Sequence, residues 1–211
     1  MSKIVFITGA SSGIGAACAR KFAQEGYTLL LNARNADKLQ TLKTELENAY
    51  STDILLLPFD VRDREAAAKA LATLPEQYQS IDILVNNAGL ALGMDKEYEG
   101  TEENYDTMIE TNITALLMIT RLVVPGMVKR GKGHIINIGS VAGDIAYPGG
   151  SVYCATKAAV KVLSDGLRMD LLDTPLRVTN VKPGLVETNF SVTRFAGDKE
   201  RADKVYHGIK P

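Results

Sequence analysis

Three polar side chains in the carboxyl-terminal half have types and a spacing that suit proton transfer to a carbonyl oxygen. Tyr153 and Lys157 are four residues apart in a segment with helical periodicity, so both side chains lie on one face of the expected helix. A phenol with an ordinary pKa of about 10 is a poor base at neutral pH unless a nearby positive charge stabilises its phenolate, and Lys157 supplies such a charge. Ser140 follows an expected strand, where its hydroxyl can donate a hydrogen bond to the reacting oxygen.

Each of these residues also has an ordinary structural explanation: a tyrosine at the edge of the core, a solvated lysine and a turn serine. An isolated tyrosine four residues before a lysine is by itself weak support for a function. Nucleophilic catalysis by Ser140 is disfavoured, because no plausible topology brings His134 or His207 near it. With only these histidines and the cysteines Cys18 and Cys154, we expect neither a disulfide framework nor a zinc site built by the protein.

A glycine-rich turn follows the first expected strand and leads into a helix. Its glycines allow positive φ angles and a close approach of the backbone, while the start of the helix presents free N–H groups to a pyrophosphate. The alternative is a plain tight turn, but the position between the first strand and the first helix favours a dinucleotide site. The residues expected to bind the cofactor here are Gly9, Ser11, Ser12, Gly13, Ile14 and Gly15.

The end of the second expected strand bears on which dinucleotide is bound. NAD-preferring sites usually place a carboxylate there for the ribose 2′-hydroxyl, whereas this chain has Ala33 followed by Arg34, whose guanidinium can pair with a 2′-phosphate. NADP is therefore the expected cofactor, although Arg34 could instead be a solvated charge before a helix that Asn35 caps. After the third strand, Asp60 and Val61 are expected beside the adenine ring; Asp60 could equally cap the next helix.

Several motifs occurring together resemble the short-chain dehydrogenase/reductase family. They appear in the family's order from residue 3 to about residue 190: the glycine-rich turn, the segment Asn86-Asn87-Ala88-Gly89, Asn112, Ser140, Tyr153-x-x-x-Lys157 and Pro183-Gly184.

The resemblance implies a role for each member of the catalytic set. Tyr153 would be the general acid/base, Ser140 would orient the carbonyl, and Lys157 would hold the nicotinamide ribose and lower the pKa of the tyrosine. Asn112 would anchor a water of the proton relay, although an asparagine within a helix can simply satisfy a backbone carbonyl. The remaining cofactor contacts expected from the resemblance are Asn86, Asn87, Ala88, Tyr153, Lys157, Pro183, Gly184, Val186 and Thr188.

Within the family the chain is most similar to NADP-dependent 3-hydroxy acid dehydrogenases that also oxidise serine or allo-threonine. The segments that carry this similarity are 86–93, 183–188 and 190–198. A hydroxy acid needs a cation at a fixed distance from the reacting carbon, and Arg194, on a substrate loop at about 185–207, is the candidate beside Ser140 and Tyr153. An ion pair of Arg194 with Asp198 or Glu200, or a subunit contact, is the alternative.

Other functions would fit the same fold. One is reduction of another small ketone or of a β-ketoacyl thioester, which would need a broad opening for a carrier arm. Another is a non-catalytic NADP sensor, whose expected mark is a broken catalytic set; here the set is complete.

Alternating β-branched runs and helical stretches around these motifs predict a single α/β domain over residues 1–211. Apolar runs such as 54–57 and 83–85 are typical of parallel strands covered on both faces by helices. The expected strands are 3–8, 28–32, 53–59, 81–86, 134–139 and 177–181. The expected helices are 13–25, 36–50, 64–74, 102–129 and 151–172.

Pro58 lies within the third expected strand, where it would remove a sheet hydrogen bond, so this strand is expected at an edge. That placement agrees with a three-layer, doubly wound Rossmann sheet of order 3-2-1-4-5-6. Family members usually continue for about forty more residues that add a last helix and a seventh strand. We therefore expect a missing carboxyl-terminal piece, without which strand 177–181 has an unpaired edge. The family also implies a homodimer or homotetramer.

The composition argues against several partners. The 211 residues carry 24 Lys and Arg against 25 Asp and Glu, so a formal charge of −1 gives no general attraction to nucleic acid or an anionic membrane. The apolar stretch 113–128 is expected to be too short and too polar to cross a bilayer, and the amino terminus lacks the pattern of a secretory signal. We expect a cytoplasmic enzyme.

Overall fold

The structure, a computed structural model, describes residues 2–206, so His207 and the end of the expected substrate loop lie outside the described residues. Its strands form one parallel sheet of order β3-β2-β1-β4-β5-β6, as predicted. The strand bounds lie within one residue of those expected from the apolar runs: β1 (Ile4–Ile7), β2 (Thr28–Ala33), β3 (Ile54–Pro58), β4 (Ile81–Asn86), β5 (His134–Ile138) and β6 (Arg177–Val181).

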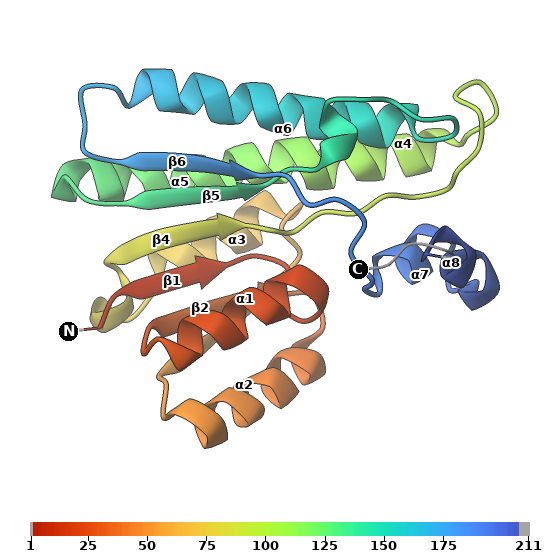
Figure 1. Cartoon of the computed structure of the whole chain (residues 1–211). Coiled ribbons are helices and arrows are strands. Elements are labelled where there is room, and N and C mark those ends of the chain that lie inside the picture. The colour runs from red at the N-terminus through yellow and green to blue at the C-terminus, as the bar shows by residue number, and fades with distance from the viewer. Residues whose placement is uncertain (1, 207–211) are drawn as a thin grey trace.

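Helices cover both faces of the sheet and give three layers (Figure 1). On one face, α1 (Gly13–Gln24) and α2 (Ala36–Tyr50) bury the alternate residues Val5 and Ile7 of β1. On the other face, Phe6 of β1 belongs to the core formed with α3 and the long helices. The helices of this second face are α3 (Arg64–Ala72), α4 (Glu102–Ile109), α5 (Ala115–Arg130) and α6 (Ser151–Asp170).

Pro58 pairs with Ala33 at the end of β3, and β3 is an edge strand as the proline predicted. At the opposite edge, no strand in residues 2–206 pairs with the outer side of β6.

The expected helix 102–129 is interrupted. A π-helical turn, η2 (Glu110–Thr114), separates α4 from α5 and contains Asn112. Such turns widen a helix by one residue and are frequent at functional sites. The periodicity of the sequence did not predict this interruption.

Residues Glu102–Arg130 together are long and apolar enough, by length and composition alone, to cross a membrane, which differs from the expectation for 113–128. Half of the most apolar window is buried, and Ile119, Val123 and Met127 belong to the core that also contains Phe6 of β1. Core helices pass the same test, so we interpret this stretch as packing against the sheet.

Residues expected as a substrate loop contain two helices, α7 (Phe190–Arg194) and α8 (Lys199–Tyr206). Figure 1 shows both beside the carboxyl ends of the strands, apart from the three layers. Two short 3₁₀ turns, η1 (Glu76–Tyr78) and η3 (Val141–Gly143), also went unpredicted; η3 directly follows Ser140.

Candidate active site

A cavity of about 900 Å³ opens at the carboxyl ends of the strands, where doubly wound sheets bind their ligands. Most of the predicted site residues line it, and they come from segments far apart in the sequence: Gly9, Ser11, Ser12, Gly13, Ile14, Arg34, Asp60, Val61, Asn87, Ala88, Ser140, Tyr153, Lys157, Pro183, Gly184, Val186, Thr188 and Arg194. Gly15, Asn86 and Asn112 do not reach the cavity wall; they are buried behind it.

The glycine-rich turn has the backbone geometry that its glycines allow. Gly9 and Gly13 have φ values of 64° and 53°, in the region that other residues rarely adopt. The first turn of α1 has no side-chain cap from Ser12, whereas Asn35, Asp63 and Thr101 each accept a backbone N–H at the start of their helices. The amino-terminal N–H groups of α1 are therefore available to an anion such as a pyrophosphate.

The motif 86–89 holds this turn in place. Asn87 donates through Nδ2 to the carbonyls of Thr8 (2.9 Å) and Gly9 (3.0 Å), and the Thr8 hydroxyl accepts the backbone N–H groups of Asn87 and Ala88 at 3.0 Å. Asn86 instead donates to Thr120 and Asn137, which links β4 to α5 and β5 inside the core.

Gly15 makes this arrangement possible because a side chain there has no room. A Cβ at Gly15 would lie 2.3 Å from the Gly9 carbonyl oxygen and 2.5 Å from Nδ2 of Asn87. We expect Gly15→Ala to lower the free energy of unfolding by about 1–3 kcal/mol and to weaken NADP binding, because the turn must move. Urea unfolding and a fluorescence titration with NADPH would measure both effects. Gly166→Ala, in a helix position with nothing within 4 Å, is the matched control, and equal losses in the two variants would contradict the packing argument.

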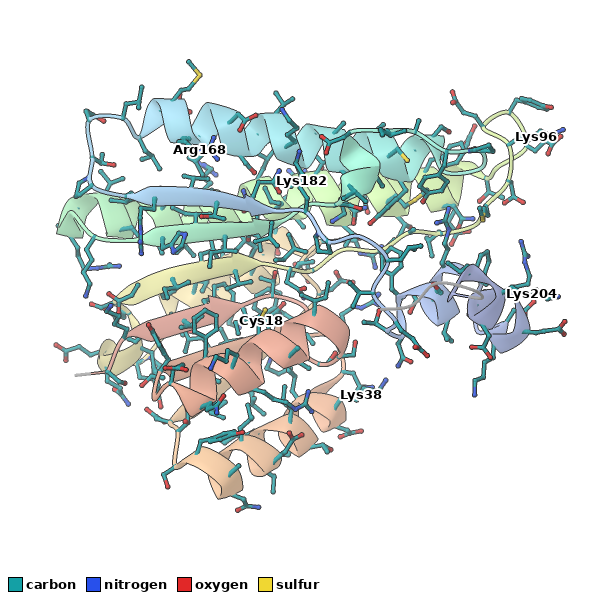
Figure 2. The ribbon with its side chains drawn as sticks, in the orientation of Figure 1. Cys18, Lys38, Lys96, Arg168, Lys182 and Lys204 are labelled. Atoms are coloured by element: carbon teal, nitrogen blue, oxygen red, sulfur yellow. The ribbon has the colours of Figure 1, made fainter. Side chains whose placement is uncertain are left out.

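Both explanations of Arg34, a ligand of the 2′-phosphate and a solvated charge before a capped helix, fit its surroundings. Asn35 caps α2 by accepting the backbone N–H of Lys38 at 2.8 Å, and the Arg34 guanidinium lines the cavity with its side chain 64% exposed. Lys38 lines the cavity from the first turn of α2 and provides a second positive charge there; Figure 2 shows its side chain at that end of the helix.

Asp60 does not cap the next helix, because Asp63 accepts the N–H of Ala66 and caps α3. The Asp60 carboxylate pairs with Arg62, at 2.8 Å from Nη2, and lies 4.0 Å from the Arg34 guanidinium. Burial opposes ionisation of Asp60, but the hydrogen bonds from Arg62 keep its pKa below the ordinary value. The carboxylate therefore stays charged at the cavity wall.

Ser140 and Tyr153 both line the cavity and interact with each other. Tyr153 is 9% exposed, and burial raises the pKa of its phenol to about 12, although a hydrogen bond with Ser140 and the charge of Arg194 lower it. The Ser140 hydroxyl also accepts the N–H of Ala142 at 3.1 Å, which orients it at the start of η3. Tyr153 therefore holds its proton firmly until a bound ligand or an added positive charge changes its surroundings.

Lys157 is buried to 6% exposure and donates to the carbonyl of Ile138 at 2.8 Å. Its Nζ lies 5.9 Å from the centre of the Tyr153 ring, and burial lowers the pKa of Lys157 to about 8. The sequence predicted that Tyr153 and Lys157 lie on one face of a helix, and both lie on α6. The groups that lower the pKa of Tyr153 here are Ser140, through a hydrogen bond, and Arg194, through its charge, so an effect of Lys157 on that pKa stays a prediction.

Both polar atoms of the Asn112 side chain are hydrogen-bonded to protein groups. Its Nδ2 donates to the carbonyl of Leu90 (2.8 Å) and to the Thr156 hydroxyl (3.0 Å), while its Oδ1 accepts the Leu90 N–H (2.9 Å). It therefore fastens the π-helical turn to the segment after the 86–89 motif, and satisfies a backbone carbonyl as its alternative explanation required. Any role in holding a water stays a prediction.

Arg194 lies on α7 and not on a loop, and it makes neither of the ion pairs considered for it. Its Nε donates to the Gly93 carbonyl (2.8 Å), Nη1 to the Tyr147 hydroxyl (2.8 Å) and Nη2 to the Gly149 carbonyl (3.3 Å). Asp198 instead accepts the backbone N–H of Arg201. Arg194 thus joins α7 to two loops of the cavity wall.

The residues present fit a dinucleotide. The large cavity offers room for it, and the uncapped start of α1 offers free N–H groups. Thr188, in the chain after β6, closes the cavity against Gly13, where a Cβ would lie 3.4 Å from the Thr188 side chain. Within residues 2–206, no group of three or more His, Cys, Asp or Glu side chains is arranged to hold a metal ion. His134, at the far end of β5, hydrogen-bonds to Thr179.

Several residues that build the site were not predicted from the sequence. They are Tyr147 on the loop before α6, the Ile138 carbonyl that receives Lys157, and Lys38. Only Lys38 had a usable signal, since it is four residues after Arg34; the others are recognised by contacts between segments distant in the chain.

Comparisons with known proteins identify the relatives of this fold. A family model described as short chain dehydrogenase matches residues 3–199. The NADP-dependent 3-hydroxy acid dehydrogenase YdfG of Salmonella typhi is 48% identical over 204 residues, which cover 96% of this chain and 81% of that protein. An NADP-dependent 3-hydroxy acid dehydrogenase of Schizosaccharomyces pombe is 44% identical over 210 residues, which cover 99% of this chain and 81% of the yeast protein.

Solved structures give the same result. A closed form of serine dehydrogenase complexed with NADP⁺ superposes with a TM-score of 0.93 at 48% identity, covering 98% of this chain and 82% of that one. A short-chain dehydrogenase from Sphingobium yanoikuyae in complex with NADPH has a TM-score of 0.84 at 36% identity, with coverage of 91% and 74%.

Proposed function

Because the chain belongs to the short-chain dehydrogenase family and is an NADP-dependent oxidoreductase acting on a CH–OH group, we propose that its substrate is a small 3-hydroxy acid. The candidates are serine, allo-threonine and 3-hydroxyisobutyrate. The observation that carries the proposal is the position of Arg194. Arg194 and Tyr153 line the same cavity, so one molecule can contact both the guanidinium and the phenol.

The chain's own residues divide the work of the reaction. Ser140 donates a hydrogen bond to the oxygen of the substrate, and the Tyr153 hydroxyl transfers a proton to or from that oxygen. NADP, when bound, supplies the nicotinamide that accepts or donates the hydride. Lys157 holds the nicotinamide ribose from its buried position, and the wall formed by α7 excludes water from the reacting groups.

The cofactor contacts are part of the proposal. The uncapped start of α1 binds the pyrophosphate, and Arg34 with Lys38 pairs with the ribose 2′-phosphate. Asp60 and Val61 lie at the wall where the adenine would lie, and the segment Pro183–Thr188 covers the nicotinamide half. Asn86 and Gly15 act indirectly, by holding the sheet and the turn that position these contacts.

The test is the rate of NADP⁺ reduction with L-serine, allo-threonine, 3-hydroxyisobutyrate and 3-hydroxybutyrate. We expect turnover with at least one acid and a kcat/KM for NADP⁺ about 100-fold above that for NAD⁺, because NAD⁺ leaves Arg34 and Lys38 without a phosphate. Equal turnover with NAD⁺ would contradict the role of Arg34. Reduction of small ketones or β-ketoacyl thioesters in place of acid turnover would favour the second enzyme, and cofactor binding without any turnover would favour a sensor.

Assembly and location complete the proposal. We propose a cytoplasmic homodimer or homotetramer, which apolar side chains exposed on the two long helices support. They are Leu117 and Val128 of α5 and Val162 and Met169 of α6. Light scattering of the purified protein would test the assembly.

A further inference from the structure

We propose that Tyr147 determines substrate specificity, because its hydroxyl and the Arg194 guanidinium together form a two-donor site for the substrate carboxylate. The inference deepens the proposed function and rests on it. The contacts of these two residues were not predicted from the sequence. The hydrogen bond between them joins the loop before α6 to α7, across 47 positions of the sequence.

The charge of Arg194 has no anionic partner among residues 2–206. Its three hydrogen-bond acceptors are two backbone carbonyls and one hydroxyl, of Gly93, Gly149 and Tyr147. The guanidinium also lies over the Tyr147 ring, 5.4 Å from its centre. These contacts fix the orientation of the guanidinium without neutralising it, so a positive charge is presented to the cavity.

The hydrogen bond between the two side chains determines where the Tyr147 proton can go. Arginine has donors and no acceptor, so the Tyr147 oxygen must accept from Nη1 of Arg194. The phenol's own O–H is then left to donate, and no hydrogen bond donated by this hydroxyl is found within the described part of the chain. A guanidinium has five N–H groups, and the three bonds above leave two of them on Nη1 and Nη2. One oxygen of a carboxylate can therefore meet the phenol O–H and the other a guanidinium N–H.

The position of Tyr147 suits a substrate that also reacts at Tyr153. Both tyrosines line the cavity and pack in one apolar cluster with Phe190 of α7. Tyr147 raises the pKa of Tyr153 and Arg194 lowers it, so both groups lie within electrostatic range of the reacting phenol.

Gly150 explains how the Tyr147 ring approaches the start of α6. A Cβ at Gly150 would lie 2.2 Å from Cε2 of that ring, so the ring occupies space that any other residue would fill. At Gly149, φ is 72° and a Cβ would lie 2.4 Å from the Met94 carbonyl oxygen. The glycine pair thus brings the ring, the 93–94 loop and the guanidinium together.

A pair of related substrates tests the site. For 3-hydroxyisobutyrate and its uncharged methyl ester, we expect Tyr147→Phe to lower kcat/KM for the acid about 10- to 100-fold, mainly through KM, and to change it for the ester less than about threefold. Tyr105→Phe is the matched control, since the Tyr105 hydroxyl donates to the Glu97 carbonyl and lies outside the large cavity. We expect its acid-to-ester ratio to equal that of the wild type.

The outcomes separate this inference from the proposed function. Equal losses for acid and ester, or no loss for either, would overturn the role of Tyr147. If the wild type oxidises no hydroxy acid, calorimetric titration of the NADP⁺-saturated enzyme with isobutyrate decides. Binding that Tyr147→Phe weakens at least tenfold and Tyr105→Phe does not would support the carboxylate site while the proposed reaction fails. Absence of binding, or binding that Tyr147→Phe leaves unchanged, would overturn the inference.

Discussion

Replacement of Tyr153 by phenylalanine is expected to lower kcat by about two to four orders of magnitude while NADPH binds with nearly wild-type affinity. The variant keeps the ring that packs with Leu90, Met108 and Phe190 and loses only the hydroxyl for which we propose the proton transfer. Steady-state kinetics with the best hydroxy acid, together with a fluorescence titration of NADPH, measures the two effects separately.

The pH dependence of the oxidation rate provides a second measurement of the role of Tyr153. Burial holds the pKa of the Tyr153 phenol at about 12 before the cofactor adds its charge, so alcohol oxidation, which needs a proton acceptor, should accelerate as the pH rises. Tyr105→Phe is again the control, because it removes a tyrosine hydroxyl from a neighbouring wall. Turnover of Tyr153→Phe within tenfold of the wild type would exclude the proposed role.

The sheet could be predicted because its signals are local. Continuous apolar runs at 54–57 and 83–85 marked strands covered on both faces, and Pro58 identified the edge strand. The helix bounds were less accurate, since fraying ends depend on caps: α3 ends at Ala72, where residue 74 was expected. The interruption at 110–114 has no periodic signal. It coincides with contacts of Asn112 to Leu90 and Thr156 that only the folded chain brings together.

In the candidate site, too, the local features could be predicted and the contacts between distant segments could not. Spacing within one element placed Tyr153 with Lys157, and chain order placed the glycine-rich turn before α1. The contacts of Arg194 could not be predicted, because they join it to Gly93 and Tyr147, 101 and 47 residues away. The capping role considered for Asp60 was wrong because Asp63 lies one turn nearer to the helix. Which of two carboxylates near one helix start accepts its free N–H groups depends on the backbone geometry, which the sequence alone does not give.

Substitution of Lys157 by methionine is expected to lower kcat/KM by about 100-fold or more and, in the absence of NADP, to stabilise the protein at pH 7. Burial lowers the pKa of Lys157 from 10.5 to about 8, so the folded protein binds this proton less tightly than the unfolded chain. The difference corresponds to about 3 kcal/mol of destabilisation below pH 8. Methionine fills a similar volume but leaves the Ile138 carbonyl unpaired, which costs about 1–2 kcal/mol, so a net gain of about 1–2 kcal/mol is expected.

The sign of the pH dependence makes this prediction specific to the buried ammonium. Between about pH 8 and 10.5 the unfolded chain holds the proton and the folded protein does not, so the stability of the wild type rises with pH relative to the variant. The advantage of Lys157→Met, measured as the difference in urea midpoint, should therefore shrink from pH 7 to pH 10. Lys161→Met, which removes an exposed ion pair with Asp165 one turn along the same helix, should show no such change. A Lys157→Met protein that is less stable than the wild type at pH 7 would mean that the hydrogen bond to Ile138 outweighs the cost of burying the charge, and that the residue is retained for the fold as well as for the reaction.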